Sequence, residues 1–349
     1  MPVIKQHVSL AVRGIKAFLN LEAGVTRAAG APALQEGTNQ SEESGRGRRQ
    51  TAAVNGQASR PPAKAAGGVV RPENVVWIFG SGRSGSTWLS SMMGDMSGQV
   101  LWGEPWVGTL FGHFYYAQDK GRRQNPQFIM GRHRETWLGS IRNFVLDAAA
   151  VTFPNLKGSD YLVIKEPNGS VGAPLLMEAL PESRMVLLVR DPRDVVASSL
   201  DARREGGWHF ERHRDRLYEQ AKEPPKKGSV EFAERRAQNY LRGMGNAKEA
   251  YDAHGGRKVL VKYEDLRTDT LGTMKRLYST LGIPVDEEEL ARVVEKHSWE
   301  NIPEDKKGEG KFYRKAKPGG WREDLTEEQA EMVERVTAPL LAELYPEKV

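Results

Sequence analysis

The sequence has no cysteine in its 349 residues, which excludes disulfides, thiolate metal sites and cysteine nucleophiles. It also lacks a run of 18 apolar residues, so no transmembrane helix is expected. Lys5, Arg13 and Lys16 interrupt any apolar core of a secretory signal. With 39% hydrophobic and 28% charged residues, the composition is typical of a soluble globular protein. These absences favour a cytoplasmic protein.

The net charge of +5 is confined to the first 70 residues, which hold nine basic residues and four glutamates. The rest of the chain holds 42 basic and 42 acidic side chains, so nucleic-acid binding by the folded part is not indicated. Residues 25–70 are rich in alanine, glycine, serine and arginine, which predicts a disordered linker. Residues 1–24 have apolar positions at helical spacing, which predicts an amphipathic helix. Residues 3–21 would then contact a membrane surface or partner, or pack on the chain's own domain.

Residues 71–349 are predicted to form one α/β domain. Val75–Phe79 is a continuous apolar run ended by a glycine, as expected of a strand that is buried on both faces. Further strands are expected at Tyr161–Ile164, Met185–Val189 and Val259–Lys262. Helices are expected at Ser86–Met96, Glu135–Ala150, Asp194–Arg203, Val230–Ala253 and Thr270–Leu281, with a capping box that opens a last helix at Thr326. This alternation predicts a P-loop-like parallel sheet flanked by helices on both faces. The charged stretch Glu205–Ser229 is predicted to be a mobile surface insertion.

A glycine-rich turn, Gly80 to Trp88, separates the first predicted strand from a predicted helix. Glycines let backbone N–H groups approach an anion, and a helix N-terminus adds positive potential. The spacing nearly fits the nucleoside-triphosphate loop G-x-x-x-x-G-K-[ST], but Ser86 stands at the lysine position and the cation is Arg83. The turn therefore predicts an anion site, and by itself it does not fix the ligand.

The segment GRSGSTWL at residues 82–89 resembles the 5′-phosphosulfate loop of sulfotransferases that use 3′-phosphoadenosine-5′-phosphosulfate (PAPS), P-[KR]-[ST]-G-[ST]-[ST]-W-[LF]. Arginine at the second position is similar to the carbohydrate and tyrosyl-protein branches of that family, and Gly82 replaces the family's proline. The resemblance implies that Arg83 contacts the bridging oxygen and that Trp88 stacks on adenine. It implies further donor-binding residues at Ser84, Gly85, Ser86 and Thr87.

Two later segments are similar to further nucleotide-binding blocks of this family. Arg190 follows a predicted strand and Ser198 lies eight positions later, a spacing that in the family belongs to the 3′-phosphate site. An arginine and a hydroxyl can both donate hydrogen bonds to a phosphate. The segment YEDL that begins at Tyr263 resembles the family's Y-E-D-L, which implies that Tyr263 reaches the nucleotide.

A fourth block, RKAKPGGWR at residues 314–322, resembles R-K-G-x-x-G-D-W-K near the C-terminus of cytosolic sulfotransferases. The resemblance implies that Arg314 and Lys315 clasp the 3′-phosphate, although Ala316 replaces a glycine whose backbone approaches that phosphate. Ser298 and Trp299 resemble the family's S-F pair, which would place Trp299 against the adenine. The alternative is that Trp299 belongs to the core.

Sulfuryl transfer requires a base at the acceptor hydroxyl and cations near the leaving oxygen. The histidine segment K-T-H-L-P of the cytosolic branch is missing here. Glu104, in WGEPW, lies 21 residues after Arg83, similar to the G-E motif of the tyrosyl-protein branch. We therefore predict Glu104 as the general base, with His113 as the alternative. Lys165, in VIKEP, is similar to the K-D-P lysine of that branch and becomes a second catalytic cation, unless it serves only a salt bridge.

The sequence does not identify the acceptor. The resemblance favours a small-molecule or glycan acceptor: a glycan, a glycolipid or another hydroxylated metabolite. Aromatic side chains after the predicted base suit sugars and phenols alike, or belong to the core; they are Trp102, Trp106, Phe111, Phe114, Tyr115 and Tyr116. No metal-ligand cluster is evident, and the chemistry needs no metal. Two rivals are a P-loop kinase or nucleotide hydrolase, and a non-catalytic nucleotide-binding scaffold.

Overall fold

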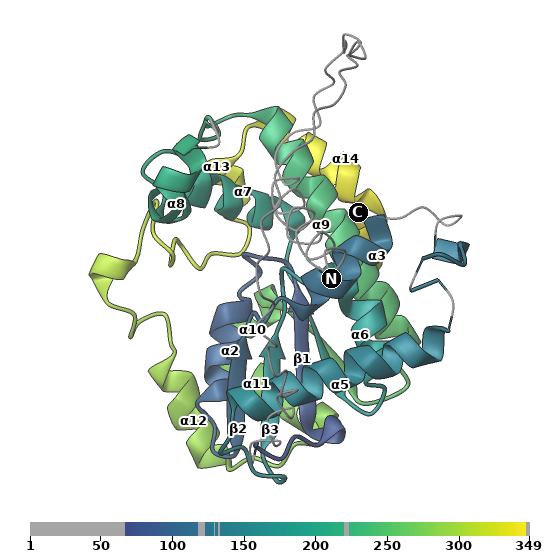
Figure 1. The fold of residues 1–349 in the computed structure, drawn as a ribbon. Coiled ribbons are helices and arrows are strands. Elements are labelled where there is room, and N and C mark those ends of the chain that lie inside the picture. Colours follow the sequence, from purple (N-terminus) through teal and green to yellow (C-terminus); the bar gives the residue numbers. More distant parts are fainter. Residues whose placement is uncertain (1–66, 118–122, 129, 132, 220–222, 347–349) are drawn as a thin grey trace, which may run out of the picture. The chain divides into compact units, whose positions relative to one another are not determined.

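The computed structural model describes residues 67–117, 123–128, 130–131, 133–219 and 223–346 (Figure 1). The chain divides into two compact units, residues 1–59 and 60–349, and the first lies outside these residues. So do the predicted N-terminal helix and the predicted linker up to residue 66. The linker's last residues are placed against the domain, because Gly68 N donates to Ala150 O (3.0 Å) and Val69 N to Leu156 O (2.8 Å).

The described part alternates strands and helices. The strands are β1 (Val75–Gly80), β2 (Gln99–Gly103), β3 (Tyr161–Lys165), β4 (Arg184–Val189) and β5 (Lys258–Lys262). The longer helices are α2 (Ser86–Gly94), α5 (Arg134–Thr152), α6 (Ala173–Ala179), α7 (Pro192–Arg203), α8 (Trp208–Glu219), α9 (Val230–Ala253), α11 (Thr270–Leu281), α12 (Glu287–Lys296) and α14 (Glu327–Leu344). The short ones are η1 (Pro72–Asn74), η2 (Thr109–His113, π-helical), α3 (Phe114–Ala117), η3 (Ser170–Gly172), α10 (Tyr263–Thr268), η4 (Glu304–Lys306) and α13 (Trp321–Asp324).

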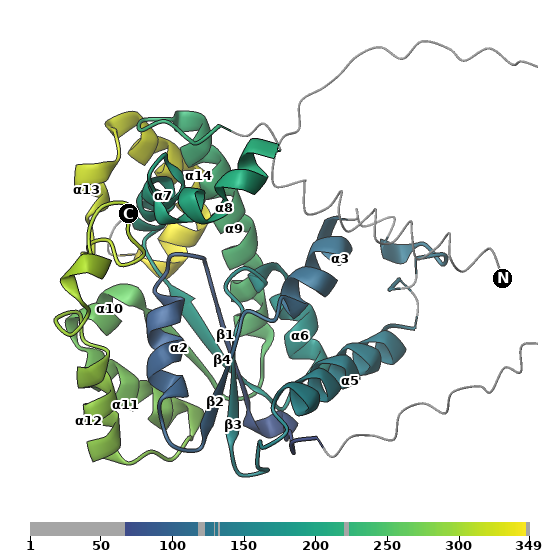
Figure 2. The same ribbon diagram turned by 60° about the vertical axis from the view of Figure 1, so that its left-hand side comes forward.

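The strands form one parallel sheet in the order β2-β3-β1-β4-β5. Helices cover both faces of this sheet, with α2, α11 and α12 on one side and α5, α6 and α9 on the other (Figure 2). The predicted parallel α/β sheet is therefore confirmed. Its central strand, β1, lies between β3 and β4. The chain builds the sheet outward from β1 in both directions, so the glycine turn after β1 lies where the strand order reverses.

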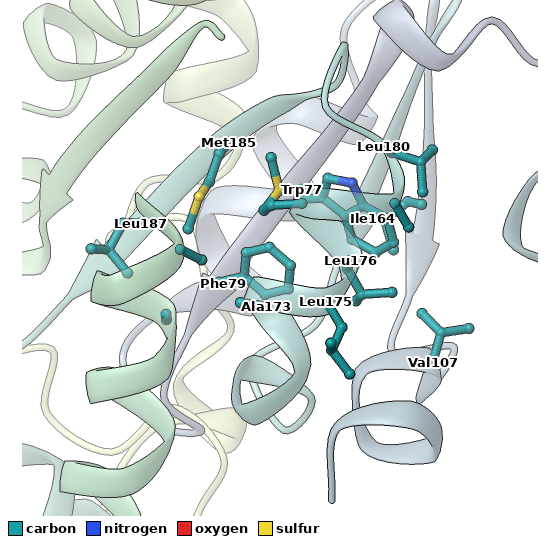
Figure 3. Close-up of a cluster of buried hydrophobic side chains, with 14 of the residues drawn as sticks. Trp77, Phe79, Val107, Ile164, Ala173, Leu175, Leu176, Leu180, Met185 and Leu187 are labelled. Carbon is teal, nitrogen blue, oxygen red and sulfur yellow. The ribbon is translucent and has the colours of Figure 1, made fainter. Parts of the chain in front are cut away.

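Side chains of β1 alternate between two hydrophobic cores, which is why its apolar run has no polar positions. Trp77 and Phe79 pack with α5, α6, α9 and α14 (Figure 3). Val76 and Ile78 pack with α2, α11 and α12. All four side chains are fully buried. Burial at about 25 cal/mol per Å² of apolar surface makes β1 a major source of the domain's stability.

Strand β2 and helix α8 are among the elements that differ from the sequence-based expectations. Strand β2 was not predicted, because its five residues include a glutamine and a glycine and its pairing partner β3 is distant in sequence. The stretch Glu205–Ser229 contains helix α8, where only an insertion was expected. Phe210 is buried, and the Trp208 ring packs against Phe312 at 5.2 Å, a partner that sequence periodicity does not reveal.

The predicted capping box is present at the start of α14. Thr326 Oγ1 accepts from Gln329 N (3.2 Å), and Gln329 Oε1 accepts from Thr326 N (3.0 Å). We expect Thr326→Ala to lower the free energy of unfolding by about 1 kcal/mol, measured by urea denaturation. Thr280→Ala, at an exposed position inside α11, should change it by no more than a few tenths. Equal effects of the two substitutions would contradict the capping role.

Candidate active site

The predicted phosphate loop leaves the carboxyl end of β1 and enters helix α2. Ser84 Oγ donates to Ser81 O (2.6 Å) and closes the turn. Arg83 and Gly85 have positive φ angles of 76° and 89°, a conformation that costs a non-glycine residue energy. The turn places the first N–H groups of α2 at the carboxyl end of the parallel sheet, which is where ligands bind in open α/β folds.

The predicted base and the predicted second cation are in direct contact. Lys165 Nζ lies 2.6 Å from Glu104 Oε1 and 3.3 Å from Thr87 Oγ1. Lys165 ends β3 and is largely buried, whereas the Glu104 side chain follows β2 and keeps 32% of its surface exposed. Because β1 and β2 flank β3, the lysine lies between the phosphate loop and the predicted base.

Two residues that sequence reasoning missed hold the turn around Glu104. Asn168 Nδ2 donates to Glu104 Oε2 (2.9 Å). The buried Glu166 carboxylate accepts from Val107 N (3.0 Å) and from Trp106 N. Both lie within three residues of Lys165. Their position directly after a buried strand is the feature of the sequence that could have indicated them. They fix a turn in which Glu104 and Trp106 adopt positive φ angles of 54° and 65°.

Burial raises the pKa of the Glu166 carboxyl to about 7. The nearby charge of Glu104 raises it further, while the two backbone N–H donors act in the opposite direction. Glu166 thus titrates near neutral pH directly beneath the turn that carries the predicted base.

A cluster of arginines lies on the other side of the phosphate loop. Arg83 Nε donates to Ser198 Oγ (3.0 Å), and Arg190 donates to Arg83 O (3.0 Å). Burial, together with the charges of Arg190, Arg203 and Arg314, lowers the pKa of Arg83 to about 10, which leaves it cationic at neutral pH. The guanidinium of Arg83 therefore lies among the groups predicted for the 3′-phosphate, and its contact with the bridging oxygen stays a prediction.

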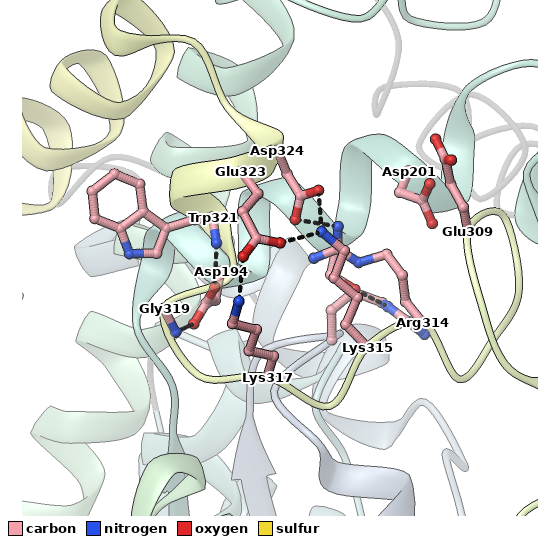
Figure 4. Close-up of polar contacts among 12 residues, drawn as sticks. Asp194, Asp201, Glu309, Arg314, Lys315, Lys317, Gly319, Trp321, Glu323 and Asp324 are labelled. Atoms are coloured by element: carbon pink, nitrogen blue, oxygen red, sulfur yellow. Dashed lines mark hydrogen bonds and ion pairs between the residues drawn. The ribbon is translucent and has the colours of Figure 1, made fainter.

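Helix α7 fastens the C-terminal basic segment over this cluster. Asp194 accepts from Gly319 N (2.7 Å) and Trp321 N (2.9 Å) (Figure 4), and Asp201 accepts from Gly310 N (3.0 Å). The two aspartates are seven residues apart and so share one face of α7. They hold both ends of the segment that contains Arg314 and Lys315.

Arg314 and Lys315 themselves bind carboxylates. Arg314 lies 2.5 Å from Asp324, and Lys315 contacts Asp324 (2.8 Å) and Glu323 (3.0 Å). These hydrogen bonds raise the pKa of Lys315. Ala316 has a φ angle of 49°, the conformation that favours the glycine it replaces in the family's motif.

Two of the predicted nucleotide-contacting residues, Tyr263 and Trp88, lie close together at the start of α2. The Tyr263 ring lies beside Gly85, 4.2 Å from the Arg190 guanidinium and 6.4 Å from the Trp88 ring. Trp88 Nε1 donates to His297 O (2.8 Å), next to Ser298. Trp299 contacts Lys307 at 5.2 Å. His113, the alternative base, lies in the π-helical turn η2 rather than in the turn of Glu104.

The polar groups fit a bound polyanion. Among the described residues, Arg190 Nε, Arg314 Nε and Ser298 Oγ are buried atoms without a hydrogen-bond partner. Native proteins rarely leave such atoms unpaired. Together with the clustered guanidinium charges, they would suit the phosphates of a nucleotide such as PAPS.

The comparisons with known proteins agree with this geometry. A sulfotransferase domain model matches residues 73–345. The chain belongs to the sulfotransferase family. The expectation of a PAPS-dependent sulfotransferase enzyme is thereby confirmed. No curated protein matches the sequence.

The sulfotransferase is similar to several crystal structures. Mouse sulfotransferase SULT7A1 complexed with PAP is 14% identical, with 78% of this chain and 86% of that chain covered and a TM-score of 0.48. Retinol dehydratase with androsterone and the inactive cofactor PAP is 20% identical (78% and 82% covered, TM-score 0.43). Sulfotransferase STF9 from Mycobacterium avium is 15% identical (78% and 77% covered, TM-score 0.48). In the described ranges, no helix is both long and apolar enough to cross a membrane.

Substitution of Gly85 tests whether the predicted phosphate loop binds the nucleotide. A Cβ at this position would lie 2.6 Å from Tyr263 Cδ2, on a backbone with positive φ. We expect Gly85→Ala to weaken binding of PAP at least tenfold, measured by isothermal titration. Gly243→Ala inside α9, where a Cβ meets nothing within 4 Å, should leave the affinity unchanged. A wild-type protein that binds ATP more tightly than PAP would contradict the nucleotide assignment.

Glu166 predicts a pH-dependent stability. The Glu166 carboxyl contributes most to the free energy of unfolding below its ordinary pKa of 4.5. This contribution is lost as the pH rises through its raised pKa of about 7 in the folded protein. Relative to Glu166→Gln, the wild-type free energy of unfolding should therefore fall by up to about 3 kcal/mol across this interval. Urea denaturation at a series of pH values measures the difference. Two parallel curves would show that Glu166 does not titrate in this range.

Proposed function

We propose that this sulfotransferase moves a sulfuryl group from PAPS to a hydroxyl of a glycan, a glycolipid or another hydroxylated metabolite, with Glu104 as the general base. The observation that carries the proposal is the position of Lys165 Nζ, within hydrogen-bond distance of both Glu104 and Thr87. Lys165 thus lies between the predicted base, where the acceptor hydroxyl would bind, and the phosphate loop.

Each residue has a role that matches its chemistry. PAPS supplies a sulfuryl group activated by its bond to a phosphate. Glu104 takes the acceptor hydroxyl's proton while the acceptor oxygen bonds to sulfur and the bond between sulfur and the phosphate oxygen breaks. Lys165 and Arg83 stabilise the negative charge that grows on the departing oxygen. The N–H groups at the start of α2 bind the 5′-phosphate.

The remaining basic residues hold the nucleotide's other phosphate. Arg190 and Ser198 contact Arg83 on the floor of the arginine cluster, and Arg314 and Lys315 lie on the segment fastened above it. Asp324 and Glu323 form ion pairs with Arg314 and Lys315. A bound 3′-phosphate would compete with these carboxylates for the same two cations. Retention of PAP by this cluster would explain why four guanidinium groups gather there despite their mutual repulsion.

Glu104→Gln and Lys165→Ala test the catalytic assignment. We expect each to lower kcat about 10²- to 10⁴-fold, since a positioned base or cation contributes on that order. The affinity for PAP should change by less than about threefold, because all the residues predicted to bind its two phosphates, apart from Lys165 at the departing oxygen, are left intact. Sulfation is measured with ³⁵S-labelled PAPS and a panel of hydroxylated acceptors.

The matched controls are Glu288→Gln on α12 and Lys275→Ala on α11, both exposed. They should retain wild-type turnover and PAP affinity. Full activity in Glu104→Gln would show that another group is the base. His113→Ala would then test the alternative base. Unchanged PAP binding with no sulfation of any acceptor by the wild-type chain would instead favour a nucleotide-binding scaffold.

A further inference from the structure

The peptide that joins Arg190 to Asp191 follows directly after the end of strand β4 at Val189. Both of its polar groups are bonded to side chains from other elements. Tyr240 Oη on α9 donates to Arg190 O (2.8 Å), and the Glu264 carboxylate on α10 accepts from Asp191 N (3.0 Å). This single peptide, next to a residue predicted for the 3′-phosphate, is therefore held from both sides.

The side chains that hold this peptide are themselves fixed. Tyr345, which directly follows α14, donates from its hydroxyl to the second carboxylate oxygen of Glu264 (3.0 Å). Tyr345 and Tyr240 are both buried. Burial raises the pKa of each phenol, so both hydroxyls keep their protons and remain donors at neutral pH. We name Tyr240, Glu264 and Tyr345 the supporting residues.

The guanidinium of Arg190 takes its position from groups close to this peptide. It lies 4.2 Å from the centre of the Tyr263 ring and donates to Arg83 O in the phosphate loop (3.0 Å). Tyr263 immediately precedes Glu264, so one short segment supplies both the ring beside the guanidinium and the carboxylate at the backbone. A rotation of the peptide after Arg190 would move the guanidinium away from the ring and from the loop.

We infer that Tyr240, Glu264 and Tyr345 are positioning residues that set the enzyme's preference for a 3′,5′-bisphosphate nucleotide over one with only a 5′-phosphate. They act through the peptide after Arg190, which directs the guanidinium. This inference rests on the proposed function, in which Arg190 binds the 3′-phosphate. A displaced guanidinium would lose a charge-assisted hydrogen bond to that phosphate, whereas the 5′-phosphate depends on the N–H groups at the start of α2.

Tyr345→Phe and Tyr240→Phe test the inference, because each removes one hydroxyl and keeps the aromatic ring in the core. Affinities for PAP and for AMP, which differ only in the 3′-phosphate, are measured by isothermal titration. We expect each variant to bind PAP about threefold to tenfold more weakly, as for the loss of one buried hydrogen bond. Its affinity for AMP should stay within about twofold of wild type, so the PAP-to-AMP affinity ratio falls.

Glu264 allows a rescue in the same measurement. Glu264→Ala removes the acceptor for Asp191 N and should lower the PAP-to-AMP affinity ratio about tenfold. Glu264→Gln keeps an oxygen that can accept from Asp191 N and gains an amide group that can donate to the Tyr345 hydroxyl. The glutamine variant should therefore keep most of the wild-type ratio.

Tyr278→Phe is the matched control. Tyr278 on α11 is buried as completely as Tyr345, and its hydroxyl accepts from Gln99 Nε2 (3.0 Å), so this substitution also removes one buried hydrogen bond. Tyr278 belongs to the other hydrophobic core, with Val76 and Ile78. Urea denaturation should show similar losses in the free energy of unfolding for Tyr278→Phe and Tyr345→Phe, but only Tyr345→Phe should lower the PAP-to-AMP affinity ratio.

The outcomes separate this inference from the proposed function. A wild-type affinity ratio in both Tyr345→Phe and Tyr240→Phe overturns the inference and leaves the proposed function intact. Equal weakening of PAP and AMP overturns it as well, because that result indicates a general loosening of the domain. A wild-type chain that binds AMP as tightly as PAP contradicts the 3′-phosphate site of the proposed function, and the inference with it. The variants remove different groups, so misfolding of one does not decide the result.

Discussion

The register of β3 between its two neighbours is the constraint on which the site depends. Lys165 is the pairing partner of Ile78 in β1 and of Gly103 in β2. Its ammonium therefore emerges between the phosphate loop that follows β1 and the glutamate that follows β2. A shift of one residue would turn the lysine to the opposite face of the sheet and separate the two halves of the site. The buried side chains of β3 itself, Leu162, Val163 and Ile164, oppose such a shift, because they would lose their core contacts.

Acidic and basic side chains have different roles around the phosphate loop. Buried carboxylates hold backbone on both sides of the phosphate loop: Glu166 holds the turn of Glu104 on one side, and Asp194 and Asp201 fasten the C-terminal basic segment on the other. On that second side, burial and the neighbouring arginines lower the pKa of Arg83. The hydrogen bonds of Asp194 and Asp201 to backbone N–H groups hold the segment of Arg314 and Lys315 close to the other cations, whose mutual repulsion would otherwise favour their separation.

The turn at Glu104, the predicted base, is held in a conformation that side chains rarely adopt. Positive φ angles at Glu104 and Trp106 are costly for residues with side chains, and such conformations persist where the surrounding structure enforces them. Here the enforcement comes from Glu166 and Asn168, both buried or bonded within the site. The same turn carries the predicted base and precedes the helix that covers residues 107–117. One local structure thus fixes both the position of Glu104 and the start of that helix.

The sequence by itself determined the parallel α/β class, the glycine turn and the order of the nucleotide-binding motifs. These features are local, since a buried strand, a left-handed turn and a capping box each depend on neighbouring residues. The same locality explains why β2, α8 and the roles of Asn168, Glu166, Asp194 and Asp201 were not predicted. Each depends on a partner far along the chain, as Asp194 does on Gly319, and a single polar residue carries no periodic signal. The contact between Lys165 and Glu104 was decided only by the tertiary structure, because strand order and register bring together residues that lie 61 positions apart.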